Sequence, residues 1–296
     1  MHPDPRGITV EGDLRPPLPI NEPVLSYVAG SPERAELKAT LDMMASEVID
    51  IPVIVGGKDI LTGDTADVVM PHDHGHVLAR YHKAAPEHIQ AAIDTGHEAW
   101  HEWSNWPWQD RAAVLLRAAD LLAGPWRATL NASTMLGQSK TVYQAEIDAA
   151  CEIIDFWRFN VQYARELYAQ QPISSPGLWN YMDYRPLEGF IYAISPFNFT
   201  SIGGNLPTAP ALMGNVAIWK PARTSLYSSY FLMRLLQEAG LPDGVINFLP
   251  GNSAQISDLL IKSPHLAGIH FTGSTAVFQS LWKDVAANLE NYRSYP

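Results

Sequence analysis

The chain has 296 residues, 47% of them hydrophobic and 17% charged, which is the composition of a globular protein with a sizeable core and not of a disordered one. Its formal net charge of −11 disfavours nucleic acid and anionic membrane surfaces as partners. A single cysteine excludes an intrachain disulfide framework, and no apolar run is long enough to cross a bilayer, so we expect a cytoplasmic protein.

The first part of the chain, residues 1–35, is proline-rich and aperiodic. We expect it to form an extended arm that lies on the surface or on a partner subunit. It has neither the apolar stretch of a signal peptide nor the composition of a transit peptide. A helix is predicted over Ser31–Ser46, because serine, proline and glutamate open it in the order of a helix start.

Two apolar runs, Ile51–Val55 and Ala66–Met70, flank a glycine-containing turn region and predict a β-hairpin or meander. Three histidines then alternate in His72–His76. Imidazole is a common metal ligand, but alternate positions in a flexible turn do not fix a coordination geometry. We therefore predict a polar turn after Pro71 and no metal site.

Helical spacing of apolar residues predicts helices over Pro86–Trp103 and Gln109–Ala123, and one or two more over Ala128–Gln170. Cys151 lies on the apolar stripe of the last segment. This stripe begins at Ile147, and Glu146 and Asp148 lie outside it. With no histidine nearby and no helix N-terminus, this cysteine is predicted to be an inert core residue and not a nucleophile.

Glu146 and Glu152 lie on different faces of the predicted helix. Either both are solvated or paired on the surface, or one of them faces a substrate ammonium group. Periodicity alone leaves the two alternatives open.

The C-terminal part alternates short apolar runs with helical segments. Before it, Pro172–Pro186 breaks the helical pattern and indicates a turn plus a strand, as a linker or as an exposed arm used in subunit pairing. Strands are predicted over Phe190–Ser195, Val216–Lys220, Val245–Leu249 and Gly268–Phe271. Each is followed by a predicted helix, over Asn205–Met213, Ser225–Ala239, Ala254–Ile261 and Thr275–Asn288.

This alternation predicts an α/β fold, a Rossmann-like, doubly wound parallel sheet preceded by helices and a small β arm. The expected organisation is an extended arm (1–35), a helical and hairpin part (36–170), a linker or oligomerisation strand (171–188) and a nucleotide-binding part (189–296).

Ligands of such a sheet bind at the carboxyl ends of its strands. The glycine signature G-x-G-x-x-G is absent, but Ser274 opens a helix whose free N–H groups suit a phosphate. Lys220 at a strand end can reach ribose hydroxyls, and Asn198 on a loop can direct its amide at a developing oxyanion. Taken singly, each has a simpler explanation, as a helix cap, a surface charge and a turn residue.

Taken together, the segments PFNF, WKPA, PDGVINFLPG and HFTGS resemble the aldehyde dehydrogenase superfamily. The stretches TMLGQSKTVYQAEIDAACEIIDFWRFN and SPFNFTSIGGNLPTAPALMGNVAIWKPA are similar to its 1-pyrroline-5-carboxylate dehydrogenase branch. The resemblance covers nearly the whole chain. It implies NAD-dependent oxidation of L-glutamate γ-semialdehyde to L-glutamate in proline degradation, through a cysteine thiolate and a glutamate base. It also implies a homo-oligomer at full length.

The resemblance also implies roles for individual residues. Asn198 matches the asparagine whose amide forms half of the oxyanion hole, and Lys220 matches the lysine that bonds the adenosine ribose. Phe199 matches an aromatic wall of the aldehyde tunnel, and Glu152 is expected to meet the amine of the substrate. The other positions expected at the cofactor are Ile194, Ser195, Pro196, Phe197, Ala222, Arg223, Gly251, Gly273 and Ser274.

Two departures from the family pattern matter. Arg223 stands where many members carry a ribose-binding glutamate, and arginine offers charge-assisted bonds to a 2′-phosphate, so we expect NAD preference with some NADP use. The family's nucleophilic cysteine and glutamate base lie downstream of the stretch that ends at Tyr292–Pro296. The resemblance therefore implies an N-terminal half that is inactive alone. The alternative is a non-catalytic nucleotide- or partner-binding module derived from the same fold.

Overall fold

The computed structural model describes residues 15–294 and residue 296, and two β-sheets organise them. A six-stranded sheet has the strand order β3-β2-β8-β7-β6-β9, and a three-stranded sheet has the order β1-β5-β4. The strands are β1 (Ile49–Ile51), β2 (Val53–Val55), β3 (Lys58–Ile60), β4 (Thr65–Met70), β5 (Asp73–His82), β6 (Phe190–Ile194), β7 (Val216–Lys220), β8 (Ile246–Phe248) and β9 (Leu266–Phe271).

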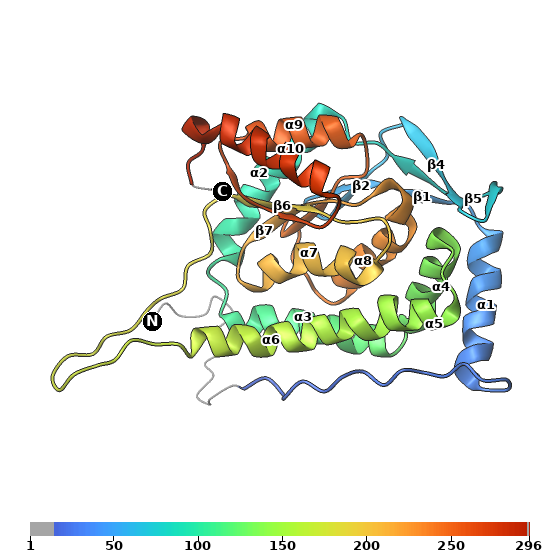
Figure 1. Cartoon of the computed structure of the whole chain (residues 1–296), viewed down its shortest axis with the longest axis horizontal. Coiled ribbons are helices and arrows are strands. Elements are labelled where there is room, and N and C mark those ends of the chain that lie inside the picture. Colours follow the sequence, from blue (N-terminus) through green and yellow to red (C-terminus); the bar gives the residue numbers. More distant parts are fainter. Residues whose placement is uncertain (1–14, 295) are drawn as a thin grey trace.

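Helices cover both faces of the larger sheet (Figure 1). One face carries α2, α9 and α10, and the other carries α7 and α8 with a further layer of α3, α4 and α6 behind them. The helices are α1 (Pro32–Ser46), α2 (Pro86–Trp103), α3 (Trp108–Ala123), α4 (Arg127–Gln138), α5 (Val142–Ala145), α6 (Ile153–Tyr168), α7 (Thr200–Leu212), α8 (Leu226–Glu238), α9 (Ser253–Lys262) and α10 (Thr275–Ala287), with the shorter segments η1 (Glu146–Glu152), η2 (Arg223–Ser225) and η3 (Leu289–Asn291).

The strands from β6 to β9 form the parallel part of the larger sheet, which confirms the predicted α/β class. Every residue of β6 and β7 is buried, because helices lie on both faces, and this is why these strands are continuous apolar runs in the sequence. The chain passes from β6 to β7 and β8 on one side and then returns to place β9 on the other side of β6. The topological switch point therefore lies between β6 and β9.

The predicted hairpin between residues 51–55 and 66–70 is wrong in its pairing. β2 pairs with β3 across Gly56 and Gly57, whereas β4 pairs with β5 in the other sheet. The predicted polar turn is also too long, because Asp73–His76 begin strand β5 and only Pro71 and His72 form the turn. Pairing with β4 supplies the backbone hydrogen bonds that extend the strand, and no local sequence signal shows them.

The helical region before the larger sheet contains a π-helical segment, η1. Its wider turn rotates the side chains relative to an α-helix, so Glu146 and Asp148 are buried while Ile147 is partly exposed. The predicted apolar stripe through Ile147 is therefore wrong at its start. Cys151 is buried as predicted, but its surroundings are polar, with Arg127 Nη2 3.4 Å from its sulfur.

The extended residues 15–28 lie along α6 (Figure 1). The backbone N–H of Glu22 donates to Asp155 Oδ1 at 2.7 Å, and that of Leu25 donates to Glu146 Oε1 at 2.7 Å. Arg127 of α4 links the extended segment to η1, because its guanidinium bonds both Glu22 and Glu146. Charged side chains of three helical elements, α4, η1 and α6, thus hold the extended segment in place.

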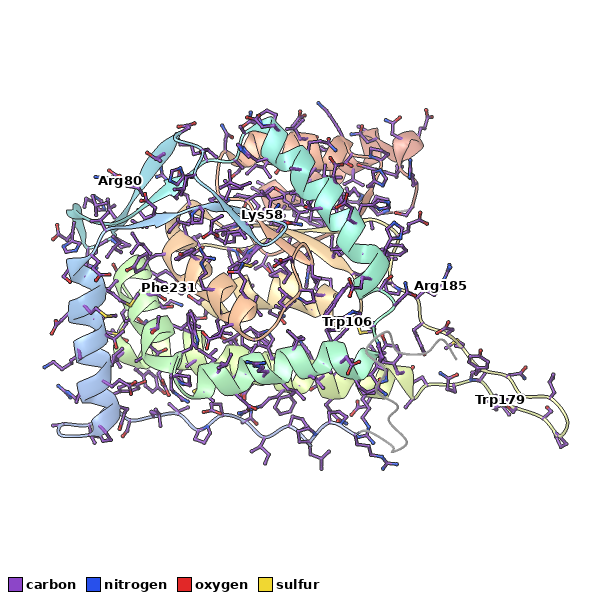
Figure 2. The ribbon with its side chains drawn as sticks, turned by 180° about the vertical axis from the view of Figure 1, so that it is seen from behind. Lys58, Arg80, Trp106, Trp179, Arg185 and Phe231 are labelled. Atoms are coloured by element: carbon purple, nitrogen blue, oxygen red, sulfur yellow. The ribbon has the colours of Figure 1, made fainter. Side chains whose placement is uncertain are left out.

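The segment 171–188 projects away from the body of the molecule, with Trp179 on its outer part (Figure 2). The strand predicted here is wrong, because only one β-bridge forms, between Ser175 and Leu178. We call this segment the projecting arm. Its apolar side chains lie in solvent, with Ile173 91% and Trp179 82% exposed. Among residues 15–294 and 296, no helix has the length and apolar character needed to cross a membrane.

Candidate functional site

The carboxyl ends of the parallel strands meet at one edge of the larger sheet. Ile194 at the end of β6 pairs with Lys220 on β7 and with Phe271 on β9. The loops that follow these strands therefore leave the sheet side by side, and the turn at Gly251 follows the neighbouring β8. The structure thus gathers the predicted cofactor positions on this edge, with Ile194, Ser195, Pro196, Phe197, Lys220, Ala222, Arg223, Gly251, Gly273 and Ser274 at or just beyond the strand ends.

Lys220 is a largely buried cation at the end of β7. Its side chain makes no hydrogen bond or ion pair with any other described residue, although the residue is only 7% exposed. Burial lowers the pKa of its ammonium group to about 8. An uncompensated ammonium group at a strand end is costly to the fold unless a ligand supplies acceptors for its N–H groups.

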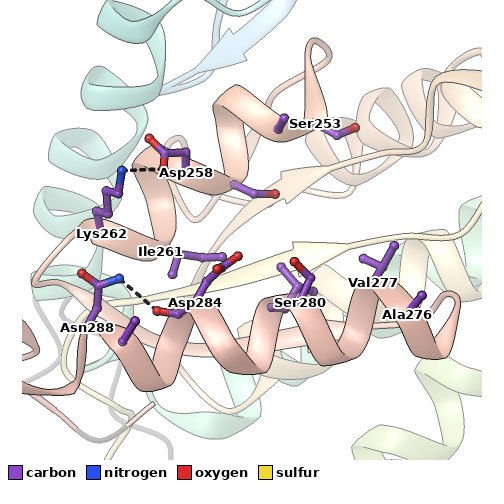
Figure 3. Close-up of a pocket in the computed structure, with 13 residues that line it drawn as sticks. Ser253, Asp258, Ile261, Lys262, Ala276, Val277, Ser280, Asp284 and Asn288 are labelled. Atoms are coloured by element: carbon purple, nitrogen blue, oxygen red, sulfur yellow. Dashed lines mark hydrogen bonds and ion pairs between the residues drawn. The ribbon is translucent and has the colours of Figure 1, made fainter.

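A groove of about 660 Å³ lies between α9 and α10 (Figure 3). It opens beside the N-termini of both helices, where Asn252 caps α9 by accepting from Ala254 N at 3.0 Å and Ser274 caps α10 by accepting from Val277 N at 3.3 Å. Small and apolar side chains line most of it, among them Ala254, Ser257, Ile261, Ala276, Val277, Ser280 and Leu281, and the polar side chains Asp258, Lys262, Asp284 and Asn288 complete the walls. A groove of this kind suits a flat apolar ring, and the helix N-termini suit an attached phosphate.

The residues of the groove walls were missed by the sequence reasoning. The available signal was the spacing of small residues three or four positions apart in both helices, at Ser253 and Ser257 and at Ala276 and Ser280. At the head of the groove, Gly251 has φ +152°, and an added Cβ would lie 3.1 Å from Ala84 N. Glycine therefore allows the turn to pass close to the neighbouring backbone.

The loop after β6 is anchored at its start and open at its tip. Ser195 Oγ accepts a hydrogen bond from Trp219 Nε1 at 3.0 Å, and the Pro196 carbonyl accepts one from Ser225 Oγ at 3.3 Å. Phe197, Asn198 and Phe199 then turn outward and are exposed. The side-chain amide of Asn198 bonds to no other described residue, so its donors are available to a ligand.

Glu152 reaches the same loop from η1. Its Oε2 accepts a hydrogen bond from Ser201 Oγ at 2.8 Å, in the first turn of α7. Asp148, four positions earlier on η1, accepts from the backbone N–H groups of Thr200 and Ser201, each at 3.0 Å. Lys140 lies 2.5 Å from Asp148 and places its Nζ 4.5 Å from the centre of the Phe199 ring. The structure therefore places Glu152 and Asp148 against the first turn of α7, directly after Asn198 and Phe199.

Arg223 opens η2, directly after β7, and its guanidinium is exposed and unpaired within the described part of the chain. With Thr224, His74 and Asp67 it lines a second cavity of about 450 Å³. An unpaired guanidinium beside a cavity can bond an anionic oxygen.

Cys151 lies apart from this edge. Its sulfur contacts Arg127, Glu146 and the Pro23 carbonyl, all on the side of η1 that faces the N-terminal segment. Burial, followed by the charge of Glu146, raises the pKa of the thiol to about 12. A buried thiol of this kind is not a nucleophile at neutral pH.

Comparison with known proteins adds a family match and several relatives. A model of the aldehyde dehydrogenase family matches residues 61–293. A protein from Agaricus bisporus named delta-1-pyrroline-5-carboxylate dehydrogenase is 52% identical over 278 residues, which are 93% of this chain and 51% of that protein. The mitochondrial protein of that name from Homo sapiens is 50% identical over 276 residues, 93% of this chain and 49% of that protein. The chain thus spans about half the length of the curated relatives it matches.

Solved structures show the same likeness. The delta-pyrroline-5-carboxylate dehydrogenase from Mycobacterium tuberculosis bound with NAD has a TM-score of 0.95 and 54% identity, covering 97% of this chain and 54% of that chain. The 1-pyrroline-5-carboxylate dehydrogenase from Thermus with bound NAD has a TM-score of 0.83 and 29% identity, covering 94% of this chain and 52% of that chain.

Proposed function

Because the chain belongs to the aldehyde dehydrogenase family, as its motifs predicted, we propose that it forms the cofactor-binding part of an NAD-dependent enzyme. The proposed reaction oxidises L-glutamate γ-semialdehyde, the open form of 1-pyrroline-5-carboxylate, to L-glutamate in proline degradation. The names of the relatives support the substrate. The observation that carries the cofactor is the largely buried ammonium group of Lys220 at the end of β7, which has no partner among the described residues.

The residues present fit NAD, which accepts a hydride when bound. Lys220 would donate to the ribose hydroxyls, and the groove between α9 and α10 would hold the adenine. The N-terminus of α10, with Gly273 and Ser274, would bind the pyrophosphate. The loop from Ser195 to Phe197 would lie against the nicotinamide half.

On the aldehyde side, the Asn198 amide would donate to the oxygen that gains negative charge as the aldehyde is attacked. Phe199 would form an apolar wall, and Glu152 would bind the ammonium group of the substrate. Glu152 suits that role because, among the residues described, its carboxylate has no cation as a partner and its hydrogen bond is to Ser201.

We further propose that the attacking thiolate does not come from residues 1–296. Cys151 is the single cysteine of this sequence, and its thiol is buried with a pKa raised to about 12. The 296 residues alone are therefore expected to bind NAD without producing NADH. Production of NADH from glutamate semialdehyde by these residues alone would overturn this part of the proposal. A cell that makes only these residues would instead favour the non-catalytic binding module.

The test of the function uses the polypeptide as its source cell produces it, supplied with glutamate semialdehyde and NAD. We expect NADH to form, and we expect Asn198→Ala to lower kcat by about 10²- to 10³-fold, as loss of an oxyanion donor does. The KM for NAD should stay within about threefold, by the same reasoning. Asn105→Ala, an exposed asparagine bonded only within its own helix end, is the control. Equal turnover of the two variants would contradict the role of Asn198.

Arg223 should make the cofactor site tolerant of NADP. We expect NADP to bind within about tenfold of NAD, because the free guanidinium can bond the 2′-phosphate. Arg223→Glu should weaken NADP binding by about tenfold or more and change NAD binding by less than about threefold, because it places like charges together. Calorimetric titration with both cofactors measures the ratio. A wild-type protein that binds NAD and not NADP would contradict the role of Arg223.

We also propose that the full-length protein is a homo-oligomer that buries the projecting arm, because Ile173 and Trp179 otherwise lie in water. Analytical ultracentrifugation that finds a monomer would contradict this. The cytoplasm remains the proposed compartment, although several relatives are named mitochondrial, and cell fractionation decides between the two.

A further inference from the structure

The N-terminus of α7 has no cap from its own sequence. The residue at the cap position is Phe199, whose side chain cannot accept a hydrogen bond. The first N–H groups of a helix have no partner inside the helix and must be satisfied in another way. Here the partner is Asp148, which comes from η1, 52 residues earlier in the chain. Its Oδ2 accepts from Thr200 N, and its Oδ1 accepts from Ser201 N. The Ser201 hydroxyl, which has one proton to donate, lies 2.8 Å from both Asp148 Oδ1 and Glu152 Oε2.

Asp148 holds this position as a buried ion. It is 3% exposed, and Lys140 pairs with it at 2.5 Å. The same Lys140 ammonium group lies over the ring of Phe199. One ion pair therefore contacts the loop on both sides of the α7 N-terminus, through two backbone N–H groups and one aromatic ring. The negative charge also suits the positive end of the α7 dipole.

The loop that Asp148 holds carries the proposed oxyanion donor. Asn198 lies two positions before Thr200, and its own side chain bonds to no other residue in the described chain. The start of the loop is fixed by the hydrogen bonds of Ser195 and Pro196. On the far side of Asn198, Asp148 accepts from the backbone N–H groups of Thr200 and Ser201, and the Thr200 hydroxyl is held separately by Thr134, Gln138 and Ser228.

We propose that Asp148 is a positioning residue for the reaction, which sets the place of Asn198 and Phe199 without touching the substrate. This inference rests on the proposed function. A shift of about 1 Å in a reacting group can lower a rate by about 10²-fold. Weakening the bonds of Asp148 to this loop is therefore expected to lower kcat.

The test compares Asp148→Asn with Asp155→Asn. The asparagine at 148 keeps the shape but removes the charge and one of the two acceptor oxygens. Asp155 is the matched control, because it also accepts from a backbone N–H and a side chain, at Glu22 and Asn21, but belongs to the N-terminal contact. Hydrogen exchange of a peptide spanning 197–204 and kcat are both measured on the polypeptide from the source cell.

We expect Asp148→Asn to speed exchange in that peptide by about tenfold or more and to lower kcat by about 100-fold, with the KM for NAD within about twofold. Asp155→Asn should change neither quantity. If Asp148→Asn does not fold, Lys140→Gln is used in its place, because it removes the ion pair to Asp148 at a more exposed position. It should give the same changes in exchange and in kcat, but smaller ones.

Unchanged exchange, or faster exchange with an unchanged kcat, would overturn the inference. So would an equal loss of kcat in both aspartate variants, because it would indicate a general structural effect. The exchange measurement needs no turnover. A wild-type polypeptide without aldehyde oxidation would therefore refute the proposed function, and the exchange result would still decide whether Asp148 holds the loop.

Discussion

Replacement of Lys220 by methionine is expected to abolish NAD binding and, at the same time, to make the free protein more stable. The ammonium group is largely buried and has no partner within the described part of the chain, and burial lowers its pKa to about 8 from the ordinary 10.5. At pH 7 the group is charged in both the folded and the unfolded state, so the folded state carries the penalty of placing that charge in a largely buried position. Methionine fills a similar space without charge. We expect a gain of roughly 2 kcal/mol, since one pKa unit corresponds to about 1.4 kcal/mol and burial is incomplete.

The sign of the pH dependence follows from the same shift. As pH rises from about 8 to 10.5, the folded protein releases this proton before the unfolded protein does, so the penalty disappears. The difference in stability between Lys220→Met and the wild type should therefore be largest at pH 7 and should shrink toward pH 10.5.

Thermal unfolding at several pH values and calorimetric titration with NAD measure both effects. Lys38→Met, on the exposed face of α1, is the control and should change neither the melting temperature nor the affinity. A Lys220→Met variant that binds NAD within about tenfold of the wild type would show that this lysine does not anchor the cofactor.

Arg127→Met should destabilise the fold by about 3 to 5 kcal/mol, because it leaves the buried Glu146 carboxylate without its cation, whereas Glu22 keeps its ion pair with Arg158. Glu146 is fully buried, and Glu22 is nearly so. Burial by itself would raise the pKa of Glu146, but hydrogen bonds from Arg127, Leu25 N and Tyr27 hold it below its usual value. The wild type should therefore keep this stabilisation above the ordinary carboxyl pKa and lose it as pH falls through the lower folded value.

Urea denaturation measures the free energy of unfolding for this variant, with Arg117→Met on the exposed face of α3 as the control. Hydrogen exchange over residues 21–27 should also rise, because the Arg127 guanidinium bonds Glu22 and the Pro23 carbonyl. A loss below about 1 kcal/mol would show that the pair is hydrated like a surface pair.

The parallel strands could be predicted from the sequence because their cause is local. A strand covered by helices on both faces must be apolar throughout, so β6 and β7 are visible as runs between turn residues. The positions of Lys220 and Ser274 near the edge of the sheet could be predicted for the same reason, because the end of an apolar run marks the end of a strand. The elements that could not be predicted depend on partners far away in the chain.

Helix α7 shows this dependence. The sequence predicts a start near Asn205, but the helix begins at Thr200, because Asp148 caps it from another segment. Strand β5 depends in the same way on its pairing with β4. The groove between α9 and α10 arises from the packing of two helices, and small residues alone do not show that two helices lie side by side.

The contact between the N-terminal segment and α6 has a consequence for synthesis on the ribosome. Asn21 and Glu22 leave the ribosome early, but their partner Asp155 follows 134 and 133 residues later. At about 5 to 20 residues per second, the segment stays undocked for roughly 7 to 27 seconds while its binding surface is made. During that time it is open to nascent-chain proteases and to chaperones. A ribosome-arrested chain that ends before Asp155 should therefore be cleaved near residues 21–27, and one that includes α6 and has left the exit tunnel should be protected there.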